Sequence, residues 1–166
     1  MSLTTEIQTE RLNLLALRPD QLRLILDDPG RLEQELGLPI SRANDSQPVR
    51  RAIGLKLDKM SGLATERHPW YTYWLVVVKA GPYGAGMAGF KGEPDQDGTV
   101  EIGYGIDPGY RNQGYTTEAA RALIAWAFEH PACRAVIAPG TQKDNPASNR
   151  VLAKLGMHVY AETGET

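Results

Sequence analysis

The chain has 166 residues, 42% of them hydrophobic and 23% charged, which is ordinary for one globular domain, and we expect a single domain over 1–166. A formal net charge of −2 supplies no basic face for nucleic acid, and no apolar run is long enough to span a membrane. One cysteine excludes an internal disulfide and, with no signal-peptide pattern, predicts a cytoplasmic protein; the three scattered histidines predict no metal site.

Hydrophobic periodicity and turn residues divide the chain into alternating elements. In chain order we predict a strand at 7–17, helices at 18–28, 31–36 and 48–60, strands at 70–79, 85–92 and 99–106, a helix at 115–130, a strand at 133–138, a helix at 145–156 and a strand at 157–162. The three middle strands are joined by turns too short for crossovers, so we expect them to be antiparallel. The predicted fold class is α/β of the α+β type, with a mixed, mostly antiparallel sheet, and not a doubly wound parallel fold.

The strand at 99–106 has one nearly bare face. Its apolar face carries Val100, Ile102, Tyr104 and Ile106, and its other face carries Glu101, Gly103 and Gly105. A glycine inside a strand marks either a bulge or a place where a ligand approaches the backbone. The strand alone leaves both interpretations open.

The stretch "DPGYRNQGYTTEAA" at 107–120 leads from this strand into the next helix. A helix N-terminus has unpaired N–H donors and a partial positive charge, Gly114 lets an anion approach, and Arg111 adds a fixed charge. By itself, R-x-x-G also fits a plain helix start with a surface arginine. Because this motif directly follows a strand with glycines on one face, it predicts a pyrophosphate-binding loop.

Two other phosphate motifs are excluded. In "GYGIDPG", Pro108 stands where the dinucleotide fingerprint needs its last glycine, and the chain has no G-K-[ST]. Further along, Asn145 followed by Pro146 is a typical helix start, which places Ser148 in the first turn. Asn145 is either a simple cap or a ligand contact at this point.

Together, "VEIGYGIDPGYRNQGYTTEAARAL", "DNPASNRVLAKLGM" and the opening "TERLNLLALRPDQL" resemble the GCN5-related N-acetyltransferases (GNAT), in the branch of the ribosomal-protein N-terminal acetyltransferases. The resemblance covers nearly the whole chain. It implies a sheet with helices on both faces, splayed around an acetyl-CoA cleft. It also implies direct transfer of acetyl from the thioester to a primary amine.

The resemblance implies roles for individual residues. The backbone of Tyr104, Gly105 and Ile106 would pair with the pantetheine arm. The pyrophosphate loop would be Arg111, Asn112, Gln113, Gly114, Tyr115 and Thr116, and Asn145 would also contact acetyl-CoA. Glu101 would act as base, by relay through water rather than by direct contact, and Ser148 would protonate the departing thiolate. The alternatives are a structural carboxylate for Glu101 and a plain first-turn hydroxyl for Ser148.

This sequence departs from the family pattern at several positions. Leu152 stands where many relatives carry a tyrosine acid, and Thr116 is bulkier than the usual residue. The sequence leaves no room for a final strand after 157–162, so we predict a homodimer that covers this edge, with a monomer as the alternative.

The acceptor would be a small-molecule amine or a protein N-terminus, with no nucleic acid and no membrane as partner. It would lie near 27–48 and 66–74, where His68, Trp70 and Tyr71 suit a cationic or aromatic group. Two alternatives remain at this point: a catalytically weak acyl-CoA-binding or sensory module, and a phosphate-binding structural protein.

Overall fold

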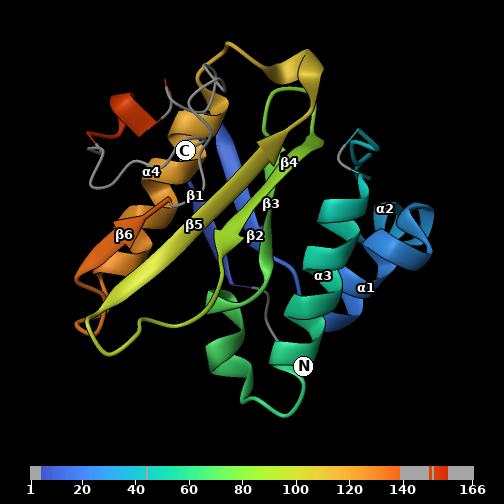
Figure 1. Ribbon diagram of the computed structural model, residues 1–166. Coiled ribbons are helices and arrows are strands. Elements are labelled where there is room, and N and C mark those ends of the chain that lie inside the picture. Colours follow the sequence, from blue (N-terminus) through green and yellow to red (C-terminus); the bar gives the residue numbers. More distant parts are fainter. Residues whose placement is uncertain (1–4, 44, 139–149, 151, 157–166) are drawn as a thin grey trace.

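The computed structural model describes residues 5–43, 45–138, 150 and 152–156, and these form one mixed sheet with helices on both faces (Figure 1). The strands are β1 (Glu6–Gln8), β2 (Leu12–Ala16), β3 (Tyr73–Val78), β4 (Tyr83–Phe90), β5 (Thr99–Ile106) and β6 (Ala135–Ile137). The helices are α1 (Pro19–Asp27), α2 (Pro29–Leu36), α3 (Gln47–Met60) and α4 (Tyr115–Phe128), with 3-10 helices at Thr65–Trp70 and Pro108–Tyr110. This is the α+β fold class that the sequence predicts.

The six strands lie side by side in chain order, β1 to β6. Each neighbouring pair is antiparallel except the last, in which β6 runs parallel to β5 because the chain crosses over through α4. The parallel register is short: it ends at the pair Glu101–Ile137, whereas β5 continues to Ile106. Within the described residues, the second half of β5 thus extends beyond its recorded pairing with β6.

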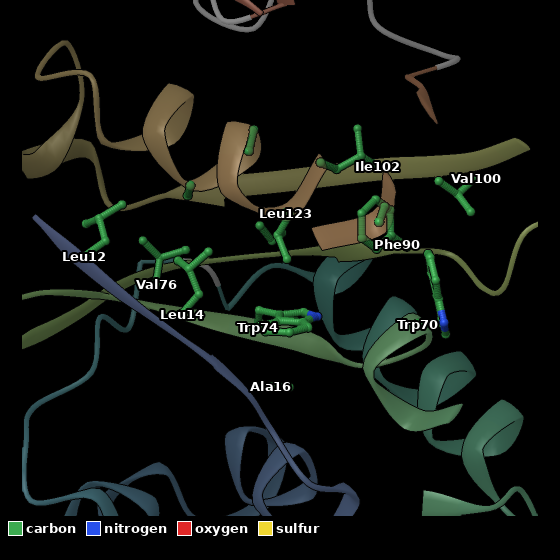
Figure 2. Close-up of a cluster of buried hydrophobic side chains, with 14 of the residues drawn as sticks. Leu12, Leu14, Ala16, Trp70, Trp74, Val76, Phe90, Val100, Ile102 and Leu123 are labelled. Atoms are coloured by element: carbon green, nitrogen blue, oxygen red, sulfur yellow. The ribbon is translucent and has the colours of Figure 1, made fainter. Parts of the chain in front are cut away.

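Two apolar cores lie on opposite faces of the sheet, because side chains alternate along each strand. The core beneath α4 gathers Leu12, Leu14, Trp74, Phe90, Ile102 and Leu123 (Figure 2). The core beneath α1, α2 and α3 gathers Leu17, Leu22, Leu32, Ile53, Leu75 and Met87. The sheet therefore has an α4 face and an α1–α3 face, and each residue of β5 belongs to one of them.

Prolines and side-chain caps mark the starts of α1, α2 and α3, although α2 begins at Pro29, two residues before the predicted start of the helix at 31–36. Pro19 and Pro29 occupy the first turns of α1 and α2, where a missing N–H costs nothing. The Asp28 side chain accepts from the Arg31 amide to cap α2, and Ser46 accepts from the Val49 amide to cap α3. No helix among the described residues is long and apolar enough to cross a membrane.

Two predicted strands are wrong in detail. The strand predicted at 7–17 is a hairpin, whose turn is closed by the Thr9 amide donating to the Leu12 carbonyl at 2.9 Å. The strand predicted at 70–79 begins only at Tyr73, because Trp70 ends a 3-10 helix that contains Pro69. The predicted start of the helix at 145–156, with Asn145 and Ser148, and the predicted strand at 157–162 lie outside the described residues.

Candidate functional site

The loop that joins β5 to α4, which we call the β5–α4 loop (residues 107–114), has an unusual backbone. Asn112 has φ 62° and Gly114 has φ 82°, and Gly114 is the N-cap of α4. In the part of the chain that the structure describes, the backbone N–H groups of 112–116 meet no protein acceptor. Successive free amides at a helix N-terminus form a binding site for an anion.

The loop has a positively charged rim. Arg111 is exposed and forms no ion pair with any described residue, so its guanidinium is available to a ligand. Asn112 and Gln113 are exposed beside it, and Gly114, Tyr115 and Thr116 are half-buried. All six residues predicted to bind pyrophosphate thus lie together around one helix end.

Arg11 holds the loop from a distant part of the chain, the start of β2. Its Nε donates to Glu118 Oε1 at 2.7 Å, and its Nη1 donates to the Gln113 carbonyl at 2.9 Å. The guanidinium also lies over the Tyr115 ring, 4.4 Å from the centroid. The conformation of the loop is therefore fixed by side chains, leaving its amides for a ligand.

Glu118, in the first turn of α4, is the partner of this arginine. Its Oε2 accepts from the Arg11 amide at 2.9 Å and from the Thr9 hydroxyl at 2.6 Å. Burial raises the pKa of Glu118, but the hydrogen bonds from Thr9 and Arg11 outweigh it and lower the pKa. Neither Arg11 nor Glu118 is among the predicted site residues, because an acid in the first turn of a helix is by itself only a sign of a helix start.

Asp107 anchors the other end of the loop. Its Oδ2 accepts from the Ser41 hydroxyl at 2.6 Å and from the Tyr83 hydroxyl at 3.1 Å, and its Oδ1 accepts from the Gly109 amide at 2.8 Å. The hydrogen bond from Ser41, followed by the one from Gly109, lowers the pKa of Asp107. An ionised Asp107 therefore ties the loop to β4 and to the segment after α2.

The bare face of β5 is on the α1–α3 side of the sheet. Val100 and Ile102 pack into the core beneath α4, so Glu101 and Gly103 project from the opposite face. A Cβ built on Gly103 would meet no atom within 4 Å. Gly105 is exposed, and Tyr104 and Ile106 pack against the α4 core. The glycines thus leave an open surface, and no bulge is recorded between β4 and β5.

Glu101 forms an ion pair on this face. Its Oε2 lies 2.9 Å from Lys91 Nζ, and about a third of its side chain is exposed. Its backbone carbonyl accepts from the Lys91 amide at 3.0 Å. The carboxylate is therefore held beside the open surface of β5 by an exposed lysine.

The three residues predicted to contact the acceptor have structural partners. Trp70 is buried in the core, with its ring centroid 4.6 Å from that of Trp126. His68 Nε2 lies 3.1 Å from the Leu63 carbonyl, and the Tyr71 hydroxyl donates to Glu93 at 2.9 Å. Neither is free in the described structure to recognise a ligand without changing partners.

A small cavity of about 40 Å³ lies on the α1–α3 face, within the region predicted to hold the acceptor. Its apolar walls come from Ile25, Ile40, Leu75 and Met87, and its polar rim from Ser41, Arg42 and Asp45. Arg42 is neutralised by Glu33, with Nη1 and Nη2 donating at 3.1 Å and 3.0 Å. Asp45 pairs with Arg50 at 2.8 Å, so the charges on the rim are already compensated.

Asn145 and Ser148, the other predicted contacts, lie outside the described residues. Among the described residues, no group of His, Cys, Asp or Glu side chains could hold a metal ion. The described part of the candidate site thus consists of a loop with free amides at a helix N-terminus, an open strand surface beside it, and a carboxylate and a small apolar cavity on the α1–α3 face.

Comparison with known proteins identifies the family of the chain. Residues 11–158 match the model of the acetyltransferase (GNAT) domain. An uncharacterised N-acetyltransferase of Bacillus subtilis, YjdG, is 35% identical over 92 residues, which are 55% of this chain and 54% of that protein. The chain thus aligns with about half the length of this relative.

Solved structures share the fold. The ribosomal-protein-S5-alanine acetyltransferase of Vibrio fischeri superposes with a TM-score of 0.65 at 19% identity, over 96% of this chain and 86% of that one. The ribosomal L7/L12 alpha-N-protein acetyltransferase RimL, in complex with coenzyme A, gives 0.59 at 19% identity, over 91% and 82%. The match of the domain model over most of the sequence shows that this chain belongs to the GNAT acetyltransferase family.

Proposed function

We propose that the chain is an acetyl-CoA-dependent N-acetyltransferase that transfers acetyl directly from the thioester to a primary amine. The observation that carries this proposal is the β5–α4 loop, whose amides and Arg111 side chain have no partner among the described residues and suit the pyrophosphate of coenzyme A. Gly114, with φ 82°, gives the loop a backbone conformation that few other residues adopt. The residues present thus fit the anionic part of acetyl-CoA.

The pantetheine arm would lie along the second half of β5. Gly103 leaves room on the strand, and the recorded pairing with β6 ends at Glu101. An extended amide-containing chain can pair with a strand in this way. The thioester would then reach the α1–α3 face of the sheet, where Glu101 projects.

The reaction needs a base, an oxyanion donor and an acid. The acceptor must lose a proton before its nitrogen attacks the thioester carbon, and Glu101 is our candidate for that base, directly or through water. Backbone N–H groups of β5 would stabilise the oxyanion of the tetrahedral intermediate. When the C–S bond breaks, coenzyme A leaves as a thiol, for which Ser148 is the proposed proton donor.

The cavity on the α1–α3 face supports a proposal about the acceptor. Its apolar walls and compensated rim charges favour a small apolar group next to the reacting amine. A protein N-terminus with a small first residue carries such a group, and so does a short aliphatic amine. We therefore propose acceptors of this kind, in which no permanent charge flanks the amine.

The test is release of the thiol from acetyl-CoA in the presence of an amine panel. Peptides with a free N-terminus and a small apolar first residue should accelerate release, while the same peptides with a blocked N-terminus should not. A protein that binds acetyl-CoA but releases no thiol with any amine would contradict transferase activity and favour a binding module. A preference for peptides beginning with Asp or Lys would contradict the assignment of the cavity.

A further inference from the structure

A second group of cations lies along α4, beyond the β5–α4 loop. They surround an open hollow of about 520 Å³, whose lining includes Arg11, Gly114, Thr117, Arg121 and Lys154. Arg121 is seven residues beyond Gly114, which is about 10 Å along a helix axis. The hollow therefore starts at the loop and continues along α4 as far as Arg121 and Lys154.

Arg121 and Lys154 are not neutralised within the described residues. The Nη2 of Arg121 donates to the Lys154 carbonyl at 3.2 Å, which joins the short helical segment around residue 154 to α4. Neither side chain forms an ion pair with any carboxylate of the described chain. Both charges are thus available to an external anion.

The two acids of the hollow do not cancel this charge. Glu118 is already engaged by Arg11, and Glu10 lies on the rim. With Arg11 and Glu118 paired to each other, Arg121 and Lys154 remain as two cations opposite Glu10 alone, in a chain whose formal net charge is −2. A local excess of positive charge on an acidic protein marks a site for an anionic group.

We propose that this hollow binds the 3′-phosphate of coenzyme A, with Arg121 and Lys154 as specificity-determining residues. The proposal rests on the proposed function, since it places the pyrophosphate on the loop amides. The 3′-phosphate is the remaining anion of coenzyme A, and the ribose separates it from the pyrophosphate, just as the hollow is offset along α4 from the loop. A guanidinium binds two phosphate oxygens at once, and a lysine adds a point charge.

The experiment compares coenzyme A with 3′-dephospho-coenzyme A by titration calorimetry at low salt. The wild-type protein should bind coenzyme A about tenfold more tightly, as expected for one or two partly exposed charge-assisted contacts. In R121Q/K154Q the affinity ratio should fall to about one, because charge-assisted contacts with the 3′-phosphate are gone, while the affinity for the dephosphorylated form stays unchanged.

The matched control is R23Q/R51Q, which removes two exposed arginines of α1 and α3 on the opposite face of the sheet. It makes the same change in net charge and should keep the wild-type ratio. In the wild type, added salt should bring the ratio toward one, since exposed charges are screened.

Equal affinities of the wild type for the two ligands at low salt would overturn the site. A ratio in R121Q/K154Q that equals the ratio in R23Q/R51Q would also overturn it. If the wild type binds neither ligand, the proposed function fails together with this site. If it binds both ligands with equal affinity, only the 3′-phosphate site fails.

Discussion

At the scale of single residues, the pKa of Lys56 on α3 lies far from its ordinary value. Its Nζ is buried, donates to the carbonyls of Tyr71 and Phe90 at 3.1 Å and 2.9 Å, and lies 4.4 Å from the Tyr73 ring centroid. Burial, followed by the nearby charges of Lys59 and Lys91, lowers the pKa of Lys56 to about 8. The folded protein thus holds this proton less tightly than the unfolded chain.

Lys56 makes stability depend on pH. Between about pH 8 and the ordinary lysine pKa of 10.5, the unfolded chain keeps the proton that the folded protein has released, so stability rises with pH. A shift of this size corresponds to about 3 kcal/mol over the full window. Urea unfolding at pH 7.5, 8.5 and 9.5 should show a rise in the wild type and a flatter profile in K56M.

The control for this prediction is K59M, which removes an exposed lysine one turn away. It should keep most of the rise. Burial raises the pKa of Tyr73, and its ionisation would lower stability above pH 10, so the comparison stays below that pH. An identical slope in wild type and K56M would contradict the lowered pKa.

Glu101 is the residue on which the proposed chemistry depends. In E101Q, turnover with a competent amine should fall and its rise with pH should flatten, because the amide cannot accept a proton. Affinity for coenzyme A should stay close to wild type. K91M, which removes the ion-pair partner and leaves the carboxylate, should retain turnover, and a wild-type pH profile in E101Q would remove Glu101 from the mechanism.

At the scale of elements, the β5–α4 loop requires a glycine at position 114. G114V should weaken binding of coenzyme A at least tenfold, because a side chain at φ 82° distorts the loop and crowds Arg11 Nη2, 3.2 Å from the added Cβ. Gly62, after α3, has φ 81° and open space around it, so G62V imposes similar backbone strain elsewhere. Calorimetry should show wild-type affinity in G62V, and equal losses in both variants would mean that the loop is not the binding site.

The contact between the start of β2 and α4 should matter for binding as well as folding. R11K keeps a charge but cannot reach Glu118 and the Gln113 carbonyl together, so affinity for coenzyme A should fall roughly tenfold. E118Q should produce a similar loss, and the double variant should lose little more, because the two residues act as a unit. Strictly additive losses in the binding free energy would contradict this coupling.

Sequence patterns are sufficient to locate most helices and strands, but not to predict which distant residues contact one another. Strand β5 and the loop after it were located correctly, because alternation, glycines and the helix start are all local signals. The turn between β1 and β2 has no such signal. Its residues, "TER", include no glycine or proline, and the Thr9 hydroxyl accepts from the Leu12 amide to close it. The contact between Arg11 and Glu118 spans 107 residues, and the burial of Trp70 depends on α4, so neither has a local signature.

At the scale of the whole molecule, binding of coenzyme A should stabilise the fold. At a concentration a hundredfold above its dissociation constant, a ligand adds about 2.7 kcal/mol, which for a domain of this size raises Tm by roughly 5–10 °C. Pantetheine, which lacks the phosphates, should give a much smaller shift. A Tm that coenzyme A leaves unchanged at saturating concentration would contradict the proposed binding.

The buried aromatic side chains beneath α4 determine how such experiments can be read. All three tryptophans of the chain belong to this cluster, with ring centroids 4.6 Å apart for Trp70 and Trp126 and 5.3 Å for Trp74 and Trp126. Intrinsic fluorescence excited at the indole band therefore reports on one side of the sheet and is optically silent on α1, α2 and α3. Comparing a fluorescence melt with a far-ultraviolet circular dichroism melt would show whether the two halves of the molecule unfold together.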